Sequence, residues 1–235
     1  MPVGSMTRHR LWTAGGILLA LGWLLAANAQ NANEQNAATT AANAPDRLAA
    51  FKSRLRDHLI PVQTLRADFV QTRTLAALDF ELTFSGQIAM EKNRRLAWIV
   101  HAPMAYVCLL HDRQLTQWDG DSNQVLTISE RSMPWLKVLH DTLGSWLAAD
   151  LEAITRDFTV ADVTETTITL TPLTPFFSEF ITTLAIAFTP DFKLAESILI
   201  TEVNGDRMRI HFKNSVLNQP IPEDTWQVPP KPKQP

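Results

Sequence analysis

The feature that most constrains the fold of this chain is a strict alternation of apolar and polar residues over 80–91, FELTFSGQIAME. Successive side chains of a strand point to opposite faces, so the pattern predicts a β-strand with one buried and one solvated face. A half-solvated strand of this kind is typical of an antiparallel sheet. The residues that share the apolar face are Phe80, Leu82, Phe84, Gly86, Ile88 and Met90.

The same period of two recurs along most of the chain. Asn204-Gly205, between two alternating runs, is a strong hairpin signal, and WDGD at 118–121 is a second one. The other alternating sets are Leu96 with Trp98 and Val100, Leu126 with Ile128, Ile168 with Leu170, Leu184 with Ile186 and Phe188, and Met208 with Ile210 and Phe212. We expect about ten or eleven strands.

Two stretches have helical spacing instead. Asp46 is a candidate cap for a first helix, which ends before Pro61. A second helix is expected from Ser132 to about Leu151. The apolar positions of the first helix are Leu48, Phe51, Leu55 and Leu59, and those of the second are Leu136, Leu139, Leu143, Trp146 and Leu147. The sequence therefore predicts a mainly β, α+β fold: a large curved antiparallel sheet with helices against its concave face.

The first 29 residues have the layout of a cleavable signal peptide. Arg8 and Arg10 precede an uncharged apolar run over 11–26, and Ala27-Asn28-Ala29 matches a small-x-small cleavage site. The alternative is an uncleaved anchor, but the run is shorter than the ~20 residues of a spanning helix. Export as a soluble protein is the favoured interpretation.

A single domain is expected over 46–228, between an Asn/Ala-rich disordered tether at 30–45 and an extended proline-rich tail at 229–235. Translation starts at Met1 or Met6, and the sequence leaves this choice open. Loss of the leader removes two of 21 basic residues and no acidic one, which leaves 19 against 24 and a net charge of −5. A mildly acidic surface argues against nucleic-acid binding.

Motifs of catalysis are not found in the sequence. It contains no G-x-S-x-G, no H-E-x-x-H and no glycine-rich phosphate loop, so we expect no enzyme, cofactor or metal. His101 and His111 could approach each other on neighbouring strands, although two imidazoles make a weak metal site and solvated strand positions are the better interpretation. Cys108 is the one cysteine and is expected to be a small buried hydrophobe.

Several large apolar residues fall on segments expected to be helices or loops, namely Trp135, Trp146, Phe176 and Phe177. They are either ordinary core or the lining of a cavity for apolar cargo that the helices cover. The residue pattern alone leaves both interpretations open.

Two long segments carry a family resemblance. Residues 51–75, FKSRLRDHLIPVQTLRADFVQTRTL, and residues 84–103, FSGQIAMEKNRRLAWIVHAP, resemble the periplasmic lipoprotein carrier LolA and its relatives. The shared features are a first helix, a strand that ends in Phe69-Val70-Gln71, then Ser85-Gly86, a basic turn, Trp98 and Pro103. Looser similarities follow at 114–118, 180–188, 204–206 and 225–230.

The resemblance implies an unclosed β-barrel of about eleven strands with a helical lid over a hydrophobic cavity. It also implies a periplasmic, monomeric carrier that takes acylated proteins from an inner-membrane transporter to an outer-membrane receptor. The receptor LolB shares this fold but carries a lipidated cysteine at its mature end. Here no cysteine stands directly after the predicted cleavage site. We expect the cavity to be lined by Phe69, Phe84, Ile88, Met90, Leu96, Trp98, Leu139, Leu143 and Trp146.

In the family, an arginine in the basic turn between two strands bonds to the lid helices and holds the cavity closed until cargo enters. Alignment on Trp98 places Lys92 at that position, with Arg94 and Arg95 just after it. A lysine offers a compact charge where arginine offers a planar fork of donors, so either Lys92 is a weaker latch or Arg94 replaces it. A plain solvated turn is the alternative.

Other functions of the same fold stay open at this point. The chain could be a specialised paralogue that ferries another lipid. It could be a sensor or interaction module that detects acylated proteins or lipids without transporting them. An enzyme that acts on lipids is disfavoured because the sequence lacks a nucleophile motif.

Overall fold

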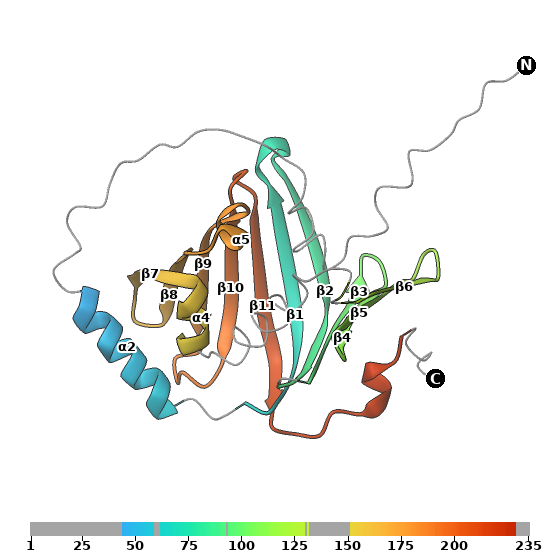
Figure 1. Cartoon of the computed structure of the whole chain (residues 1–235), viewed down its shortest axis with the longest axis horizontal. Coiled ribbons are helices and arrows are strands. Elements are labelled where there is room, and N and C mark those ends of the chain that lie inside the picture. Colours follow the sequence, from blue (N-terminus) through green and yellow to red (C-terminus); the bar gives the residue numbers. More distant parts are fainter. Residues whose placement is uncertain (1–43, 59–61, 93, 130, 132–150, 229–235) are drawn as a thin grey trace, which may run out of the picture.

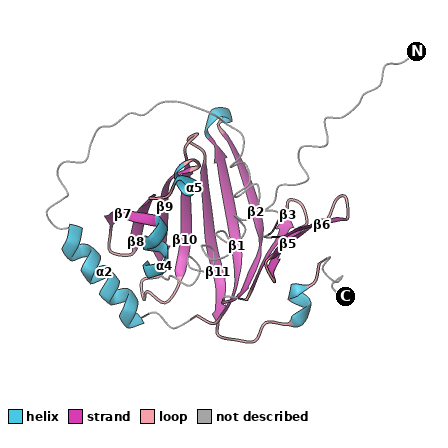
Figure 2. Cartoon of the chain, viewed as in Figure 1, coloured by secondary structure: helices cyan, strands magenta, loops and turns pink. Residues whose placement is uncertain are grey.

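One curved antiparallel sheet of eleven strands forms the body of the protein (Figures 1 and 2). The structure is a computed structural model that describes residues 44–58, 62–92, 94–129, 131 and 151–228. The strands are β1 Thr64–Leu75, β2 Phe80–Glu91, β3 Arg95–Ala102, β4 Tyr106–His111, β5 Gln114–Asp119, β6 Gln124–Ser129, β7 Phe158–Val163, β8 Thr167–Pro172, β9 Ile181–Phe188, β10 Ala195–Glu202 and β11 Arg207–Leu217. The predicted number of strands is confirmed.

The sheet is not closed, because its edge strands β6 and β7 do not pair with each other. The spatial order is β6-β5-β4-β3-β2-β1-β11-β10-β9-β8-β7, so each half is a run of hairpins and β1 lies beside the last strand, β11. All of these pairs are antiparallel. The residue pattern predicted a large curved antiparallel sheet, the family resemblance implied an unclosed barrel, and both are confirmed.

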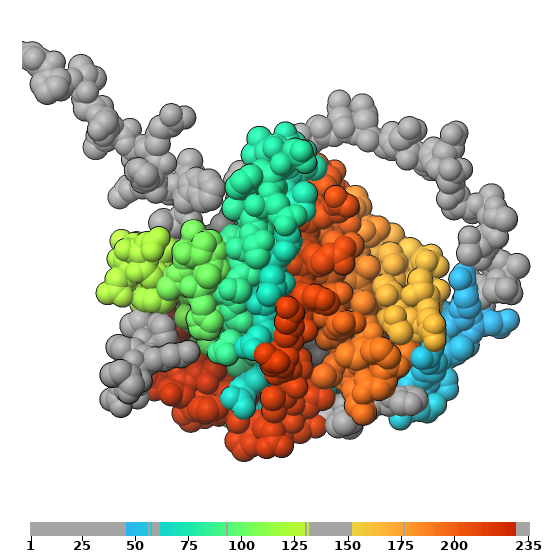
Figure 3. All heavy atoms as spheres, turned by 180° about the vertical axis from the view of Figure 1, so that it is seen from behind, coloured from blue at the N-terminus to red at the C-terminus, as the bar shows by residue number. Residues whose placement is uncertain are grey.

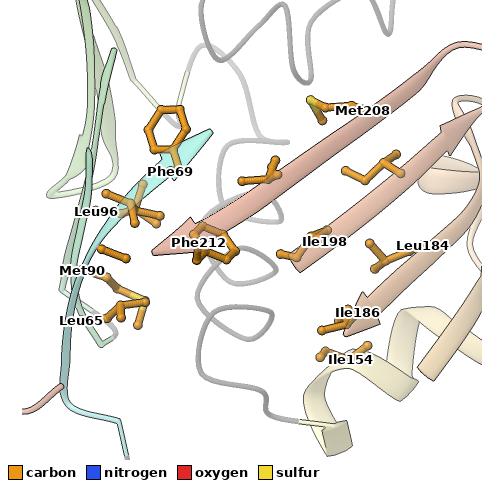
Figure 4. Close-up of a cluster of buried hydrophobic side chains, with 14 of the residues drawn as sticks. Leu65, Phe69, Met90, Leu96, Ile154, Leu184, Ile186, Ile198, Met208 and Phe212 are labelled. Atoms are coloured by element: carbon orange, nitrogen blue, oxygen red, sulfur yellow. The ribbon is translucent and has the colours of Figure 1, made fainter. Parts of the chain in front are cut away.

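Rows of directly opposed residues run across the sheet and define its inner face. In the first half, one row is Leu65, Met90, Leu96, Leu110 and Leu115, all of which are buried. In the second half, one row is Ile210, Ile198, Ile186 and Ile168, which are also buried. Side chains of both halves point toward the same interior (Figure 4). The alternation in the sequence therefore marks the inner face correctly.

The first helix, α2, spans Ala44–His58 and packs Phe51 and Leu55 into this interior. The prediction that Asp46 caps the helix is wrong, because the helix begins two residues earlier and Asp46 lies in its first turn. Pro45 suits that first turn, since proline lacks the N–H that would have no partner there. An acidic residue in the first turn still favours the positive end of the helix dipole.

The second predicted helix falls on residues 132–150, which lie outside the described residues. The next described helix is α4, Leu151–Asp157, whose Ile154 is buried in the same interior. Helix α4 begins at Leu151, the predicted end of the second helix, and leads directly into β7. A short helix, α5 (Pro175–Ser178), follows β8 and buries Phe177 against Phe158, with 5.0 Å between the ring centroids.

A smaller apolar cluster lies on the outer face of the sheet. After β11 the chain continues through the short helix η4, Glu223–Trp226, and buries Ile221 and Trp226 against Ala89 and Ala97. Alanines at these outward positions leave room for the indole ring. The C-terminal segment is therefore part of the fold up to residue 228, and the predicted tail at 229–235 lies outside the described residues.

The hairpins follow their sequence signals. Gly205, in the turn between β10 and β11, has a φ of +88°, a left-handed conformation that favours glycine. Gly86 on β2 is needed for a different reason: a Cβ at this position would lie 1.9 Å from the carbonyl oxygen of Ile99. The two strands approach closely here, where their register shifts between Ser85 and Gly86.

We predict that Gly86→Ala destabilises the protein by at least the ~1–3 kcal/mol typical of overpacking, because the clash is with backbone rather than with a movable side chain. Urea unfolding followed by circular dichroism measures the change. Gly205→Asn is the matched control and should cost less, because asparagine tolerates a positive φ and the nearest atom to a Cβ there is 3.5 Å away. Equal losses in the two variants would contradict the packing argument.

Candidate functional site

The inner face brings together most of the residues predicted to line a lipid site. Phe69, Ile88, Met90, Leu96 and Trp98 come from β1, β2 and β3 and are between 1% and 7% exposed. Phe84 is partly buried and packs against the same cluster. The other three predicted residues, Leu139, Leu143 and Trp146, lie outside the described residues. That any of these side chains binds lipid stays a prediction.

Phe69 and Trp98 form the aromatic centre of this wall. Their ring centroids are 4.1 Å apart with 31° between the ring planes, although their strands are separated by β2. Gly86 is the residue of β2 opposite Phe69, so no side chain stands between the two rings. The same glycine that permits the close strand approach thus also permits this aromatic contact.

Next to Trp98, the row of opposed residues continues through Cys108 on β4 to Gln117 on β5. Cys108 is fully buried, as predicted, and burial raises the pKa of its thiol well above the ordinary value. The indole Nε1 of Trp98 and the amide Nε2 of Gln117 are both buried, and neither has a hydrogen-bond partner in the described structure. Polar groups without partners are rare in protein interiors.

One end of the interior carries a buried ionic cluster. Arg73 Nη2 donates to Glu202 Oε2 at 2.9 Å and to Asp206 Oδ2 at 3.3 Å. Asp206 also accepts a 2.9 Å hydrogen bond from the backbone N–H of Ala76, which ties the β1–β2 and β10–β11 hairpins together. Burial raises the pKa of Glu202, as does the charge of Asp206, while Arg73 opposes the shift. Buried charges of this kind are tolerated because they are paired.

Exposed apolar side chains gather at this same end of the sheet. Leu78 and Phe80, at the tip of the β1–β2 hairpin, are 71% and 52% exposed, and Val203 in the β10–β11 turn is 54% exposed. Leu173, 55% exposed, precedes α5. Two residues after α5, the carbonyl of Phe180 accepts a backbone hydrogen bond from Val203. We call these four exposed residues the rim. Figure 3 shows the β1–β2 hairpin standing at the top of the molecule.

In the basic turn between β2 and β3, Arg94 is bound to a residue of the same hairpin. Arg94 Nη1 donates to Glu91 Oε2 at 2.8 Å, and its side chain is 63% exposed. The backbone N–H of Lys92 donates to the carbonyl of Gln63 at 2.8 Å, so this turn lies beside the segment that joins α2 to β1. The role of Lys92 or Arg94 as a lid latch stays a prediction.

Arg95 is the most strongly bound residue of the turn, and it faces outward. Its guanidinium donates to both Glu91 and Glu223 at distances of 2.6–2.9 Å and lies 4.3 Å from the ring centre of Trp226. Hydrogen bonds from Arg95 are the largest cause that lowers the pKa of Glu91 and of Glu223. Arg95 therefore fixes the C-terminal segment to the outer face.

Helix α2 is held at the other end of the second half of the sheet. The Phe51 ring lies 5.7 Å from Phe188 on β9 and 5.3 Å from Phe192 in the following turn. Arg54 stacks over Phe192 at 4.2 Å and donates to the carbonyl of Glu165 at 3.2 Å. Phe192 adopts a φ of +57°, unusual for a bulky residue, while it is fully packed. This aromatic group is a small, local anchor for α2.

Several polar residues of the interior were missed by the sequence analysis. Gln71 and Arg73 follow Phe69 at the inward positions of β1, and Gln117 follows Leu115 at an inward position of β5. A polar residue at a position where the alternation demands an apolar one was the available signal. Without a known inward face for these strands, the signal could not be interpreted.

The weak metal site is excluded by the strand register. His111 lies opposite Arg95, six residues along β3 from His101, so the two imidazoles do not meet. Among the residues that the structure covers, no group of three His, Cys, Asp or Glu side chains is placed to hold a metal ion. In the same part of the chain, no helix has the length and apolar character needed to cross a membrane.

Comparison with known protein families shows to which family this chain belongs. The sequence model of the family described as outer membrane lipoprotein carrier protein LolA matches residues 61–229. The chain belongs to the LolA family. The match covers the whole sheet and the C-terminal segment on its outer face, so the similarities proposed at 114–118, 180–188 and 204–206 lie within it, as does all but the last residue of 225–230. No curated protein matches the sequence.

Solved structures with a similar arrangement include members of the LolA superfamily. A LolA superfamily protein from Nitrosomonas europaea has 11% identity and a TM-score of 0.42, with 76% of this chain and 96% of that chain covered. A putative outer membrane lipoprotein-sorting protein domain from Vibrio parahaemolyticus has 10% identity, a TM-score of 0.40 and coverages of 80% and 97%. The MucA/MucB complex from Pseudomonas aeruginosa has 15% identity, a TM-score of 0.43 and coverages of 77% and 60%. Similarities at this level carry no argument about the function of the present LolA-family chain.

We predict that Arg95→Met lowers the thermal midpoint at neutral pH and flattens its dependence on acid. A carboxyl whose folded pKa is lowered contributes stability above its ordinary pKa of 4.5, and this contribution is lost as the pH falls through the lowered value. Without Arg95 the largest cause that lowers the pKa of Glu91 and of Glu223 is absent, and only the weaker effects, including that of Arg94, remain. Thermal unfolding between about pH 7 and pH 3 measures both effects.

The control for this prediction is Arg94→Met. It removes only the exposed contact with Glu91 and should leave the acid dependence close to that of the unmodified protein. An Arg95→Met curve that runs parallel to the unmodified one, merely displaced, would show that the two carboxyl groups do not depend on Arg95.

Proposed function

We propose that this protein is a periplasmic carrier that holds the acyl chains of lipoproteins in its interior and shuttles them from the inner to the outer membrane. The observation that supports this most directly is the match to the LolA family across the sheet. The continuous inner face of Leu, Ile, Met and Phe side chains agrees with it, because acyl chains need an apolar environment of that kind. Transfer of intact acyl chains breaks no covalent bond, so the proposal requires no catalytic residue.

The energetics of the cargo explain why a carrier of this kind is needed. Exposure of an acyl chain to water costs about 0.8 kcal/mol per methylene, so two or three long chains together cost tens of kcal/mol. A sheet that contributes apolar side chains from both halves removes most of this cost. Binding must nevertheless be reversible, since a carrier that holds its cargo too tightly cannot deliver it.

Reversible binding requires a lid whose open and closed states differ by only a few kcal/mol. We assign α2 to this lid, together with the predicted helix that carries Leu139, Leu143 and Trp146. The anchor of α2 is local: Phe51 meets two phenylalanine rings and Arg54 stacks on one of them. A small number of contacts can be exchanged for contacts with an entering acyl chain. The latch assigned to Lys92 or Arg94 belongs to the same proposal.

Direction comes from the partners in this proposal. An inner-membrane transporter loads the carrier, and an outer-membrane receptor accepts the cargo. The four rim residues, Leu78, Phe80, Leu173 and Val203, are exposed at one end of the sheet and are the part of the described surface best suited to apolar contact with such proteins.

The decisive experiment is native mass spectrometry of the mature protein, purified gently and without detergent from the periplasm. We expect a one-to-one complex with triacylated protein or peptide. Free phospholipid or fatty acid alone would contradict lipoprotein transport and indicate a paralogue for another lipid. Stable capture of acylated protein without passage to outer-membrane vesicles would instead indicate a sensor.

We also predict that Leu96→Gln weakens binding of a saturable apolar fluorescent probe by about tenfold or more, because an amide placed in the apolar interior costs ~1–3 kcal/mol. Leu109→Gln is the matched control, since Leu109 lies on the neighbouring strand but packs with the outer cluster. It should bind the probe as the unmodified protein does. Circular dichroism confirms that both variants are folded, and equal loss of binding in both would place the probe outside the inner face.

A further inference from the structure

Two hydrogen-bond donors are buried on the inner face without an acceptor. They are Nε1 of Trp98 on β3 and Nε2 of Gln117 on β5, and no described residue pairs with either. The two residues are 7% and 4% exposed. They lie in one row of the sheet, separated only by Cys108, which is opposite both of them.

The surroundings of this row are apolar. The adjacent row on one side is Leu96, Leu110 and Leu115, and all three are buried. Cys108 adds no charge, because burial raises the pKa of its thiol and keeps it protonated. A buried donor without a partner typically destabilises a protein by ~1–3 kcal/mol, so two of them in one apolar wall are unusual.

The charged side chains that are buried in the described part of the chain, Arg73, Arg95 and Asp206, are all engaged in ion pairs. Arg95, three residues before Trp98 and on the outward face of β3, binds Glu91 and Glu223 on the outer side of the sheet. Arg73 on the inner face binds Glu202 and Asp206 at the end of the interior. Among the described residues, no cation is therefore placed to neutralise an anionic ligand beside Trp98 and Gln117.

We propose that Trp98 and Gln117 form a recognition site for ester carbonyl groups, where each donates a hydrogen bond to a carbonyl oxygen at the glyceryl end of the acylated cargo. This inference rests on the proposed function. An ester oxygen accepts hydrogen bonds without donating any and carries no charge, which matches two donors in a neutral apolar wall. A fatty-acid carboxylate would be buried without a counter-charge, which is costly.

The separation of the donors favours two acceptors rather than one. Neighbouring strands lie about 4.8 Å apart, so the backbones of β3 and β5 are separated by about 10 Å. A lipid that carries two acyl esters can offer one carbonyl oxygen to each donor. The site thus selects diacyl glycerides over free fatty acids and over plain hydrocarbon.

The test compares two soluble ligands of the mature protein, dioctanoylglycerol and its dioctyl diether analogue. They have the same chain length and the same hydroxyl group, but only the first has carbonyl oxygens. Affinity is measured by displacement of an apolar fluorescent probe. We expect the diester to bind more tightly than the diether, by about fivefold for each hydrogen bond to a neutral carbonyl.

Gln117→Met and Trp98→Phe each remove one donor and put an apolar side chain of similar shape in its place. Each variant should lose about fivefold more affinity for the diester than for the diether, because only the diester has a carbonyl oxygen for the missing donor. Gln71→Met is the matched control: the same substitution at another buried inward position, on β1, outside the Trp98–Cys108–Gln117 row. It should keep the preference for the diester.

The outcomes separate this inference from the proposed function. Equal binding of diester and diether by the unmodified protein overturns the ester site and leaves the carrier function intact. A parallel loss for both ligands in the variants also overturns it, because packing rather than the carbonyl group would then explain the effect. Failure of both ligands to displace the probe overturns the carrier proposal as well.

Discussion

The pairing of β1 with β11 is the interaction on which the rest of the structure depends. It joins the first described strand to the last one, and among the described strands it is the only link in the sheet order between the β2–β6 half and the β7–β10 half. Phe69 lies directly opposite Phe212 across this junction, and Gln71 lies opposite Ile210. Without it, each half would be a meander of hairpins with one apolar face open to water. Such a long-range pairing carries a large loop-closure cost, which the shared interior must offset.

Once β1 and β11 are paired, the curvature of the sheet gives both halves a common interior. The apolar rows of the two halves then belong to one shared core, so neither half requires a core of its own (Figure 4). The ionic cluster of Arg73, Glu202 and Asp206 stands at one end of the same junction, since Arg73 is on β1 and both carboxylates flank the β10–β11 turn. On the outer face, Arg95 lies against the Trp226 ring and fixes the C-terminal segment there. This contact does not involve the interior of the sheet.

The period of two predicted the strands and their inner face, because burial on one side of a strand dictates alternation locally. Leu96, Trp98 and Val100 are buried where the pattern placed them, and the turn at Asn204-Gly205 forms as expected. The start of α2 was misjudged at Asp46, since an acidic residue is favoured both as a cap and in the first turn. Local patterns carry no information on which distant strands become neighbours, so the pairing of β1 with β11 was not predicted.

The outer cluster and the donors of the interior show the limit of this approach most clearly. Trp226 drew attention only as part of a loose family similarity at 225–230, yet it packs in a short helix against two alanines that have no pattern of their own. Gln117 breaks the alternation of β5, but a single polar residue at an inward position has the same appearance whether it is a defect, a structural hydrogen bond or a ligand contact. Only the position of its neighbours across β4 and β3 distinguishes these cases.

Binding and release in such an interior depend on opposing requirements. A purely apolar wall would hold acyl chains by contact area alone and could not distinguish a glyceride from a hydrocarbon. A permanent charge would distinguish them but would have to be desolvated in the empty protein, at a cost that grows with burial. Neutral donors such as the indole of Trp98 and the amide of Gln117, which have no acceptor among the described residues, lie between these limits. Their desolvation destabilises the protein without cargo, and a hydrogen bond to a carbonyl oxygen offsets it. Selectivity is thus gained without a contact strong enough to prevent delivery.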